Sequence, residues 1–421
     1  MYLFLYRATL FFIRAAIRLS ALKNNKARQW LAGRKNIFAE LRERIPQNER
    51  IIWFHSASLG EFEQGRPVIE HLRKRYPDYK ILLTFFSPSG YEIRKNYEGA
   101  DFIFYLPMDS RENARRFLEI VNPCLVFFIK YEFWYYYLTG VAEQKIPLLL
   151  ISAAFRKEQP FFKWYGKLYR KMLFSFSHIF LQDNFSKELL ATIGIEDRAT
   201  VAGDTRFDRV AEIAAKFEPV NEITTFIEHG QVMVAGSTWP EDERILVQAI
   251  GSSGEVSWKM IIAPHEIHSE HIDDIRHLFP DSILYSELST TSPNTVRQSR
   301  VLIIDNIGLL ARLYQYGLFS FVGGGFNRNG IHNILEAAVY GKPVLFGPNH
   351  KKYLEATELI AAGGAVGIAD GNQLKQAIRN WLIDKESYTQ ACTAADQYVR
   401  NQAGATNKIL VFIQEKRLLT R

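Results

Sequence analysis

Short apolar runs alternate with stretches of helical periodicity from residue 50 to the end of the chain. In the first half, the apolar runs predict strands at residues 51–55, 80–85, 102–105, 124–129, 147–151 and 178–182. In the second half, they predict strands at residues 232–238, 259–263, 282–285, 300–304, 318–322 and 343–346. This alternation of strands and helices is typical of doubly wound α/β domains with parallel sheets.

The two series of strands indicate two domains, joined by the segment that begins GDTRFDRV and extends to about Pro219. We expect an N-terminal domain over residues 23–210 and a C-terminal domain over residues 211–395. A final helical segment, residues 396–421, is expected to pack back on the first domain. Two such domains leave a cleft, and ligands of parallel sheets bind at the carboxyl ends of the strands.

The first 22 residues, MYLFLYRATLFFIRAAIRLSAL, are apolar but contain Arg7, Arg14 and Arg18. They lack the basic start and the cleavage site of a secretory signal peptide, and the arginines interrupt any membrane span. At about 100° per residue the arginines form one stripe of a helix. Most of the remaining surface of this helix is apolar, at Leu3, Leu5, Leu10, Phe11, Phe12 and Ile13.

Two interpretations of this N-terminal helix remain open. The helix lies in the headgroup region of a membrane, or it packs on the domain with its arginines in water. The apolar arc is wider than one packing face needs, which favours the membrane. Basic residues that would meet anionic lipid headgroups follow the helix, at Lys23, Lys26, Arg28 and Arg34.

Composition limits the class of protein and its partners. With 421 residues and 47% hydrophobic content, the chain can form two globular cores. The two cysteines, Cys124 and Cys392, provide neither a disulfide framework nor a zinc site. A net charge of +7 favours an anionic partner, such as a membrane surface or a phosphorylated substrate. Nucleic acid is disfavoured, because the sequence has no RNA-binding or helix-turn-helix signature.

Glu61 stands out in the first domain, because it ends the stretch HSASLGE after the first predicted strand. Gly60 can adopt the backbone angles of a tight turn, and a helix is expected to start near Glu61. Two roles for this carboxylate remain open. An acidic residue is stabilised in the first turn of a helix by the peptide dipoles. It also lies at the carboxyl end of a strand, where ligands bind.

The stretch LFSFVGGGFNRNGIHNILEAAVYGKPVLFGP predicts a ligand site in the second domain. A strand ends in the run Gly323–Gly325, which would let a ligand approach the backbone closely. We expect a helix to begin near His332–Asn333, with its free N–H groups offering a phosphate site. Glu336 is then positioned to accept hydrogen bonds from ribose hydroxyls. The alternative is a plain glycine turn with a capping Asn and a first-turn acid.

The whole chain resembles the 3-deoxy-D-manno-octulosonic acid (Kdo) transferases of lipopolysaccharide assembly. Besides the apolar-basic N-terminus, the resemblance rests on HSASLGE, TFFSPSGYE, YLPMDSRENARRFL, EFW, GDTRFD, FVGGGF and HNILEAA, in this order. It implies the GT-B arrangement, with two Rossmann-like domains facing across a cleft. It also implies inverting transfer of Kdo from CMP-Kdo to a lipid A precursor, lipid IVA. The expected location is the cytoplasmic face of the bacterial inner membrane, as a peripheral or monotopic protein.

The resemblance also assigns roles to individual residues. Glu61 matches the general base, and Arg206 occupies a position where the family commonly has a lysine near the departing phosphate. CMP is expected to contact Pro264, His265, Ile307, Gly308, Leu309, Asn333, Ile334, Leu335 and Glu336. Neither a metal ion nor another cofactor is expected, since CMP is already a good leaving group.

Three positions depart from the family pattern. Many members have Pro-Arg-His where this chain has Pro264, His265 and Glu266, which weakens or replaces one cationic phosphate contact. Lys130 replaces the first acid of E-x-E-L-W and either stabilises developing charge or has a structural role. Leu309 replaces a frequent acid.

Two other functions are alternatives to Kdo transfer. Another GT-B nucleotide-sugar transferase or a sugar epimerase would have a different base region, and the stretches HSASLGE and SPSGYE argue against it. A membrane-peripheral scaffold without activity would not need Glu61, Arg206 and Glu336.

Overall fold

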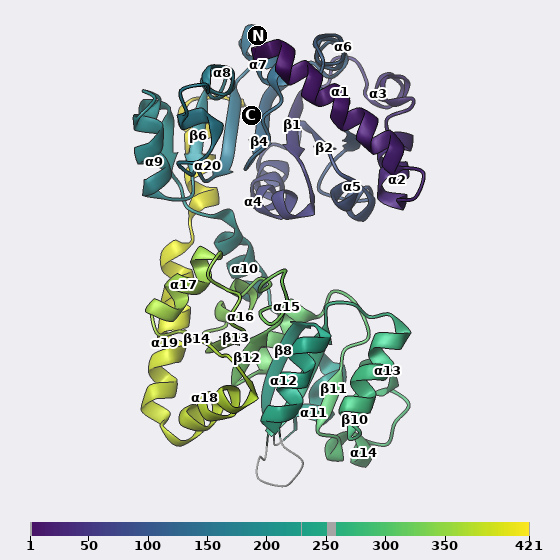
Figure 1. The fold of residues 1–421 in the computed structure, drawn as a ribbon, viewed down its shortest axis with the longest axis vertical. Coiled ribbons are helices and arrows are strands. Elements are labelled where there is room, and N and C mark those ends of the chain that lie inside the picture. The colour runs from purple at the N-terminus through teal and green to yellow at the C-terminus, as the bar shows by residue number, and fades with distance from the viewer. Residues whose placement is uncertain (1, 229, 251–257, 421) are drawn as a thin grey trace. The chain divides into compact units, whose positions relative to one another are not determined.

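A computed structural model of the protein describes residues 2–228, 230–250 and 258–420. The chain forms two compact units. Unit 1 contains Met1–Arg209 and Ala403–Arg421, and unit 2 contains Val210–Gln402. Helix α10 (Thr205–Ala215) contains the point where the chain passes from unit 1 to unit 2 (Figure 1).

Unit 1 is built on a parallel sheet of seven strands in the order β3-β2-β1-β4-β5-β6-β7. The strands are β1 (Ile51–Ser56), β2 (Lys80–Phe85), β3 (Phe102–Tyr105), β4 (Pro123–Ile129), β5 (Leu148–Ala153), β6 (His178–Leu181) and β7 (Ala199–Val201). The six strands predicted in this half are confirmed, and β7 was not predicted. The strand order reverses between β1 and β4, where ligands bind in sheets of this type.

Helices cover both faces of this sheet. One face carries α4 (Leu59–Arg75), α5 (Pro88–Arg94) and α20 (Ala405–Glu415). The other carries α3 (Ile37–Arg44), α6 (Arg111–Val121), α7 (Tyr135–Glu143), α8 (Lys167–Phe174) and α9 (Asn184–Ala191). Helices α1 (Tyr2–Ser20) and α2 (Asn25–Ala32) complete the unit. Both faces are therefore buried, as the nearly continuous apolar strands require.

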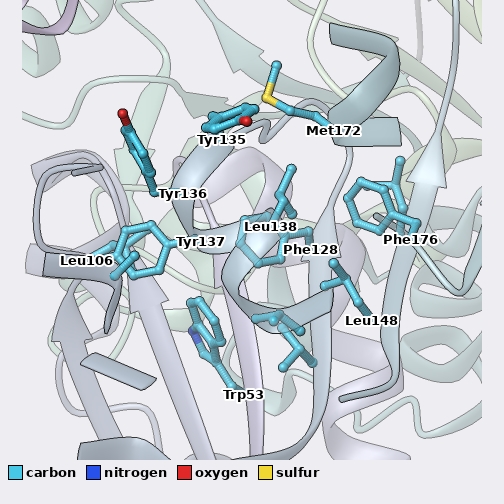
Figure 2. Packing of buried hydrophobic residues seen from close by; sticks show 14 of the residues in the cluster. Trp53, Leu106, Phe128, Tyr135, Tyr136, Tyr137, Leu138, Leu148, Met172 and Phe176 are labelled. Atoms are coloured by element: carbon cyan, nitrogen blue, oxygen red, sulfur yellow. The ribbon is translucent and has the colours of Figure 1, made fainter. Parts of the chain in front are cut away.

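Alternate residues of β1 enter different cores. Trp53 joins the cluster on the α7 side, where its ring centroid lies 4.8 Å from that of Phe117. Figure 2 shows Trp53 in this cluster together with Tyr137 of α7. Phe54 points to the opposite face and stacks on Phe127 at 4.4 Å. Side chains alternate across a strand, so one run of apolar residues serves two cores.

The C-terminal segment is divided between the units. Residues 396–421 were expected to form one helical segment on the first domain, but α19 (Lys385–Gln402) continues to Gln402 in unit 2. Only α20 packs in unit 1, where Ile409 and Ile413 are fully buried. Asp208 fixes its start, because its carboxylate accepts hydrogen bonds from the backbone N–H groups of Gly404 and Thr406.

Unit 2 repeats the architecture with the strand order β10-β11-β9-β8-β12-β13-β14. Its strands are β8 (Gln231–Thr238), β9 (Trp258–Pro264), β10 (Ser282–Leu284), β11 (Val301–Ile303), β12 (Phe319–Val322), β13 (Val344–Phe346) and β14 (Ala365–Gly367). Its helices besides α19 are α11 (Thr224–Ile227), α12 (Pro240–Ile250), α13 (Ser269–Leu278), α14 (Pro293–Gln298), α15 (Leu310–Leu313), α16 (Leu335–Ala338), α17 (Leu354–Ala361) and α18 (Gly371–Ile383). The six strands predicted here are confirmed, and β14 was not predicted.

Helix α1 packs on unit 1 through one face and exposes the other. Leu10 is buried, and the Tyr6 hydroxyl donates a hydrogen bond of 2.6 Å to Asp109. Arg7 donates from Nε to the Tyr136 hydroxyl, so the expectation of a single arginine stripe facing lipid is wrong for Arg7. On the outer face, several large apolar side chains are exposed, namely Phe4, Leu5, Phe11, Phe12 and Leu19. Among the described helices, none has the length and apolar content needed to cross a membrane.

Arg34 has a structural role instead of the expected headgroup contact. Its guanidinium stacks on the Trp30 ring at 3.9 Å. It donates hydrogen bonds of 2.8 and 2.7 Å to the backbone oxygens of Leu106 and Phe86. Burial lowers the pKa of Arg34 to about 9. The expectation that this side chain meets lipid is therefore wrong, because its donors hold three segments of unit 1 together.

Candidate functional site

Glu61 lies in the first turn of α4, at the carboxyl end of β1. The helix begins at Leu59, so Gly60 is helical and the expected tight turn at this glycine is wrong. Ser58 is the N-cap instead. Its backbone N–H donates to Glu61 Oε2 at 3.0 Å, and its hydroxyl donates to the same oxygen. Glu61 therefore forms a capping box with Ser58, and as an acid in the first turn of α4 it fits the structural role considered for it.

The capping contacts use only one oxygen of this carboxylate. Within the described residues, Glu61 Oε1 has no hydrogen-bond partner. The side chain is half-buried at the point where the strand order reverses. Glu61 can thus cap the helix through Oε2 and still accept a proton or a hydrogen bond through Oε1.

Lys130 directly follows β4, the strand next to β1. Its φ of 64° lies in the left-handed region, and Ser152 at the end of β5 has a φ of 55°. Such backbone angles cost about 1–3 kcal/mol each in non-glycine residues and are frequent at functional sites. The backbone N–H of Lys130 donates to Ile151 O at 2.9 Å, so pairing with β5 maintains the conformation. Glu61 and Lys130 occupy the same edge of the sheet.

Arg206 lies in the first turn of α10, and Asp204 holds its guanidinium. The Nη2 and Nε atoms of Arg206 lie 2.7 and 2.8 Å from Asp204 Oδ2. Thr205 hydrogen-bonds to the backbone oxygen of Gln64 in α4. The start of α10 is therefore tied to the helix that carries Glu61, and unit 1 brings Glu61, Lys130 and Arg206 to one edge of its sheet.

Tyr131 is a residue of this edge that sequence reasoning missed. Burial raises the pKa of its phenol, Arg156 lowers it, and the carboxylates of Asp183, Asp204 and Glu61 raise it further. These electrostatic effects show that several charged groups lie near its ring. Its position between Lys130 and Glu132 in KYEFW was the available signal.

Glu132 is held in a hydrogen-bonded cluster beside β1. Its Oε2 lies 3.1 Å from Nε2 of the fully buried His55 and accepts from Trp134 Nε1 at 2.6 Å. His55 Nδ1 lies 2.9 Å from the Thr84 hydroxyl. This network connects the ends of β1, β2 and β4, which gives the EFW motif a structural purpose.

The three glycines after β12 accommodate protein backbone. A Cβ on Gly323 would lie 2.3 Å from Ser237 O, and one on Gly325 would lie 2.5 Å from Gly347 N. Gly324 has a φ of 89°, and its Cβ would lie 2.4 Å from Gly330 O. The expectation that these positions are open for a ligand is therefore wrong. They allow the ends of β8, β12 and β13 to pack against each other.

The helix expected from His332–Asn333 starts later and is short. Helix α16 has four residues, and Glu336 is the second of them. Asn333 precedes the helix, where its Oδ1 accepts from Leu335 N at 3.2 Å and its Nδ2 donates to Glu336 Oε1 at 3.0 Å. A single turn has little dipole, so the predicted phosphate contact would depend on individual N–H groups here.

His265 belongs to a stack of three rings at the carboxyl edge of the second sheet. Its ring centroid lies 4.7 Å from Trp239 and 4.3 Å from His332. Trp239 Nε1 donates to His332 Nε2 at 2.9 Å. Burial lowers the pKa of both histidines, that of His332 to about 4. His265 therefore presents a neutral ring where the family often has arginine.

Trp239 and Asp242 were missed by sequence reasoning. Asp242 Oδ2 accepts from the backbone N–H groups of Trp239 and Gly324, at 2.9 and 2.8 Å. Burial raises the pKa of Asp242 to about 6. This carboxylate joins the ring stack to the glycine run. The position of Trp239 directly after β8 was the available signal.

The turn Ile307–Leu309 follows β11. Gly308 has a φ of 100°, and the space around its Cβ position is open. Leu309 is nearly buried, whereas Ile307 is 87% exposed. Pro264 is the last residue of β9, and the other site residues predicted in unit 2 follow β9, β11 and β12, so all lie at the carboxyl edge of one sheet.

Comparison with known proteins agrees with these observations. The family model described as 3-Deoxy-D-manno-octulosonic-acid transferase (kdotransferase) matches residues 32–209. The 3-deoxy-D-manno-octulosonic acid transferase of Haemophilus influenzae is 24% identical over 403 residues, which is 94% of this chain and 93% of that protein. The enzyme of the same name from Rickettsia felis is 28% identical over 77% of this chain and 70% of its own length.

Solved structures show the same fold at low sequence identity. The UDP-GlcNAc 2-epimerase of Neisseria meningitidis has a TM-score of 0.60 at 18% identity, covering 87% of this chain and 100% of its own. A glycosyltransferase from Rickettsia africae has a TM-score of 0.54 at 15% identity, with 87% and 98% covered. The chain is therefore a relative of the 3-deoxy-D-manno-octulosonic acid transferases and has two parallel α/β units of the GT-B type.

Proposed function

We propose that the protein is an inverting glycosyltransferase that moves Kdo from CMP-Kdo to a lipid A precursor, lipid IVA. The observation that carries this proposal is Glu61 Oε1, which has no hydrogen-bond partner among the described residues and lies at the carboxyl edge of a domain that matches the Kdo transferase model. The alternative of a sugar epimerase or a different nucleotide-sugar transferase has fold similarity in its favour.

In the proposed reaction, the acceptor hydroxyl donates a hydrogen bond to Glu61 Oε1. As the hydroxyl oxygen bonds to the anomeric carbon of Kdo, its proton passes to Glu61. The bond between that carbon and the CMP phosphate breaks, and its electron pair leaves with the phosphate. Lys130 and Arg206 supply positive charge for the phosphate. Asp204 keeps the Arg206 guanidinium in place.

The donor is assigned to unit 2 in this proposal. Glu336 would accept hydrogen bonds from the ribose hydroxyls, and Asn333 already fixes its carboxylate. The stack around His265 offers a flat, neutral surface beside the nucleotide. No metal ion or other cofactor is assigned a role. The proposed place of the reaction is the cytoplasmic face of the inner membrane, where α1 would rest on anionic lipid.

The test separates catalysis from helix capping. Glu61→Gln retains an oxygen for the cap but removes the base, so turnover should fall by about 10²–10⁴. Ser58→Ala is the matched control, because it removes the capping hydroxyl and keeps the carboxylate. It should cost about 1 kcal/mol of stability and leave turnover within roughly tenfold.

The assay is CMP release from CMP-Kdo with and without the lipid A precursor, together with mass spectrometry of the product. Near-normal turnover of a folded Glu61→Gln protein would show that Glu61 only caps α4. Absence of any transfer by the unmodified protein would contradict the proposed function. It would favour the alternative that the protein is a membrane-peripheral scaffold without activity.

A further inference from the structure

A basic cavity lies in unit 1 under the second half of α1. Its volume is about 790 Å³. Arg14 and Arg18 of α1 form one wall, and Asn113 and Arg116 of α6 contribute to the lining. Another wall comes from residues 30–32, 34–39 and 42. Figure 1 shows α1, α2, α3 and α6 gathered on this side of unit 1. Pro107 and Met108, which follow β3, also line the cavity, whereas Glu61, Lys130 and Arg206 do not.

All the charged residues that line the cavity are basic. They are Arg14, Arg18, Arg34, Lys35, Arg42 and Arg116, and no Asp or Glu of the described residues belongs to the lining. Within the described part of the chain, Arg14, Arg18, Lys35 and Arg42 have no carboxylate partner. Several uncompensated cations around one hollow produce a positive potential that attracts anions.

The basic walls are partly fixed in position. Arg34 is held by backbone oxygens at the inner side, and the Arg116 guanidinium stacks on the Phe38 ring at 4.2 Å. Arg42 and Arg116 also line a neighbouring cavity of about 470 Å³, which contains Glu49 and Glu119. Arg18 and Lys35 line the basic cavity but do not line the neighbouring cavity. Substitutions of these two residues therefore test the basic cavity specifically.

The surface beside the cavity is apolar. Phe11 and Phe12 are each 68% exposed on α1, and Leu19 and Leu22 are 70% and 79% exposed. Arginines of the same helix face the cavity. A ligand with a compact anionic head and apolar chains matches both surfaces at once.

We propose that this cavity binds a phosphomonoester group. Its terminal phosphate carries up to two negative charges and three acceptor oxygens, which suits several arginines better than a singly charged phosphodiester does. The adjacent apolar face of α1 favours a lipid that carries this group, although a soluble phosphomonoester has the same chemistry. The inference does not depend on Kdo transfer, since binding is measured without donor or turnover.

The experiment compares vesicles that contain equal fractions of phosphatidic acid, a phosphomonoester, or phosphatidylglycerol, a phosphodiester. The full-length protein should bind the phosphatidic acid vesicles at least roughly tenfold more tightly. The double variant Arg18→Gln, Lys35→Gln should lose this preference. The control Lys23→Gln, Lys26→Gln removes the same charge from the same end of unit 1 but does not alter the cavity lining. It should weaken binding to both vesicles equally and keep the preference.

Competition with glycerol 3-phosphate distinguishes the two sources. Displacement from phosphatidic acid vesicles at millimolar concentration would assign the cavity to a soluble phosphomonoester, and no displacement would assign it to a lipid. Thermal unfolding verifies that both double variants are folded. Equal binding of the two vesicle types by the unmodified protein would overturn the proposal. Equal loss of preference in the cavity variant and the control would also overturn it, because surface charge alone would then account for the binding.

Discussion

The hydroxyl of Tyr6 on α1 donates a hydrogen bond of 2.6 Å to the buried carboxylate of Asp109. The same carboxylate accepts from the backbone N–H groups of Tyr136 and Tyr137 at the start of α7. The Asp109 carboxylate therefore connects the N-terminal helix to the start of α7. The helix is a packed element of this unit as well as the carrier of an exposed apolar face.

Tyr6→Phe should loosen α1, because the buried Asp109 carboxylate loses one donor at a cost of about 1–3 kcal/mol. Hydrogen exchange of residues 2–20 measures this loss. Tyr2→Phe is the matched control, since no hydrogen bond of the Tyr2 hydroxyl occurs in the described residues. Equal exchange in the two variants would show that the Tyr6 hydroxyl contributes little to holding the helix.

The stability of unit 1 should depend on the titration of Asp109. Burial raises the pKa of its carboxyl group to about 6 in the folded protein, above the usual value of 3.8. The folded state therefore binds the proton more tightly, and the contribution of Asp109 to stability is lost as pH rises from about 4 to about 6. Asp109→Asn cannot titrate, so the melting temperature of the unmodified protein minus that of the variant should fall over this range. A constant difference would contradict the prediction.

The glycines of unit 2 should differ in their tolerance of alanine. Gly324→Ala combines a left-handed φ with a clash against the backbone of Gly330, and should cost at least about 2–4 kcal/mol. Gly308→Ala has a similar φ but open space, and should cost only about 1 kcal/mol. Urea unfolding of the two variants provides the comparison. Similar losses would mean that the loops move apart to admit the methyl group.

Glu336→Ala should weaken CMP binding, because the ribose hydroxyls would lose a charged acceptor worth roughly 1.5–3 kcal/mol. Glu336→Gln is the control for structure, since an amide oxygen can still accept from Asn333 Nδ2. Calorimetric titration with CMP measures both. Unchanged affinity of the Glu336→Ala variant would move the nucleotide away from α16.

Phe11→Ser with Phe12→Ser should release the protein from anionic vesicles and leave its melting temperature nearly unchanged, because both side chains are exposed. Point variants are preferable to deletion of the helix, because deletion would also abolish the hydrogen bond between Tyr6 and Asp109. Ile383→Ser in unit 2, where the side chain is 71% exposed, controls for a general loss of apolar surface. Retained sedimentation with vesicles would place the membrane contact elsewhere.

Most strands were predictable from the sequence because each is a short apolar run. The runs are apolar because both faces of a parallel sheet are buried. The two strands that were missed, β7 and β14, are edge strands of three residues with an exposed central side chain, Thr200 and Val366. Such a segment does not differ from a loop in its sequence pattern. The start of α4 was misplaced by two residues because Gly60 suggested a turn, whereas Ser58 provides the cap.

Contacts between distant segments account for most of the other errors. Arg34 lies in a basic stretch, but Phe86 and Leu106, whose backbone oxygens it contacts, come from other parts of the chain. The run Gly323–Gly325 is filled by backbone from Ser237, Gly330 and Gly347. Neither relationship can be inferred from local periodicity. The carboxyl-edge position of Glu61 was predictable, because it depends only on the strand that precedes it.

The separation of α20 from the rest of unit 1 in the sequence has a consequence for synthesis of the protein. Ile409 and Ile413 fill the core beside α4, yet the ribosome makes them after every residue of unit 2. Unit 2 can therefore fold on the nascent chain while the first sheet still lacks part of its cover. Unit 1, which is begun first, is completed last, and its exposed apolar face must be protected from aggregation until the final helix emerges.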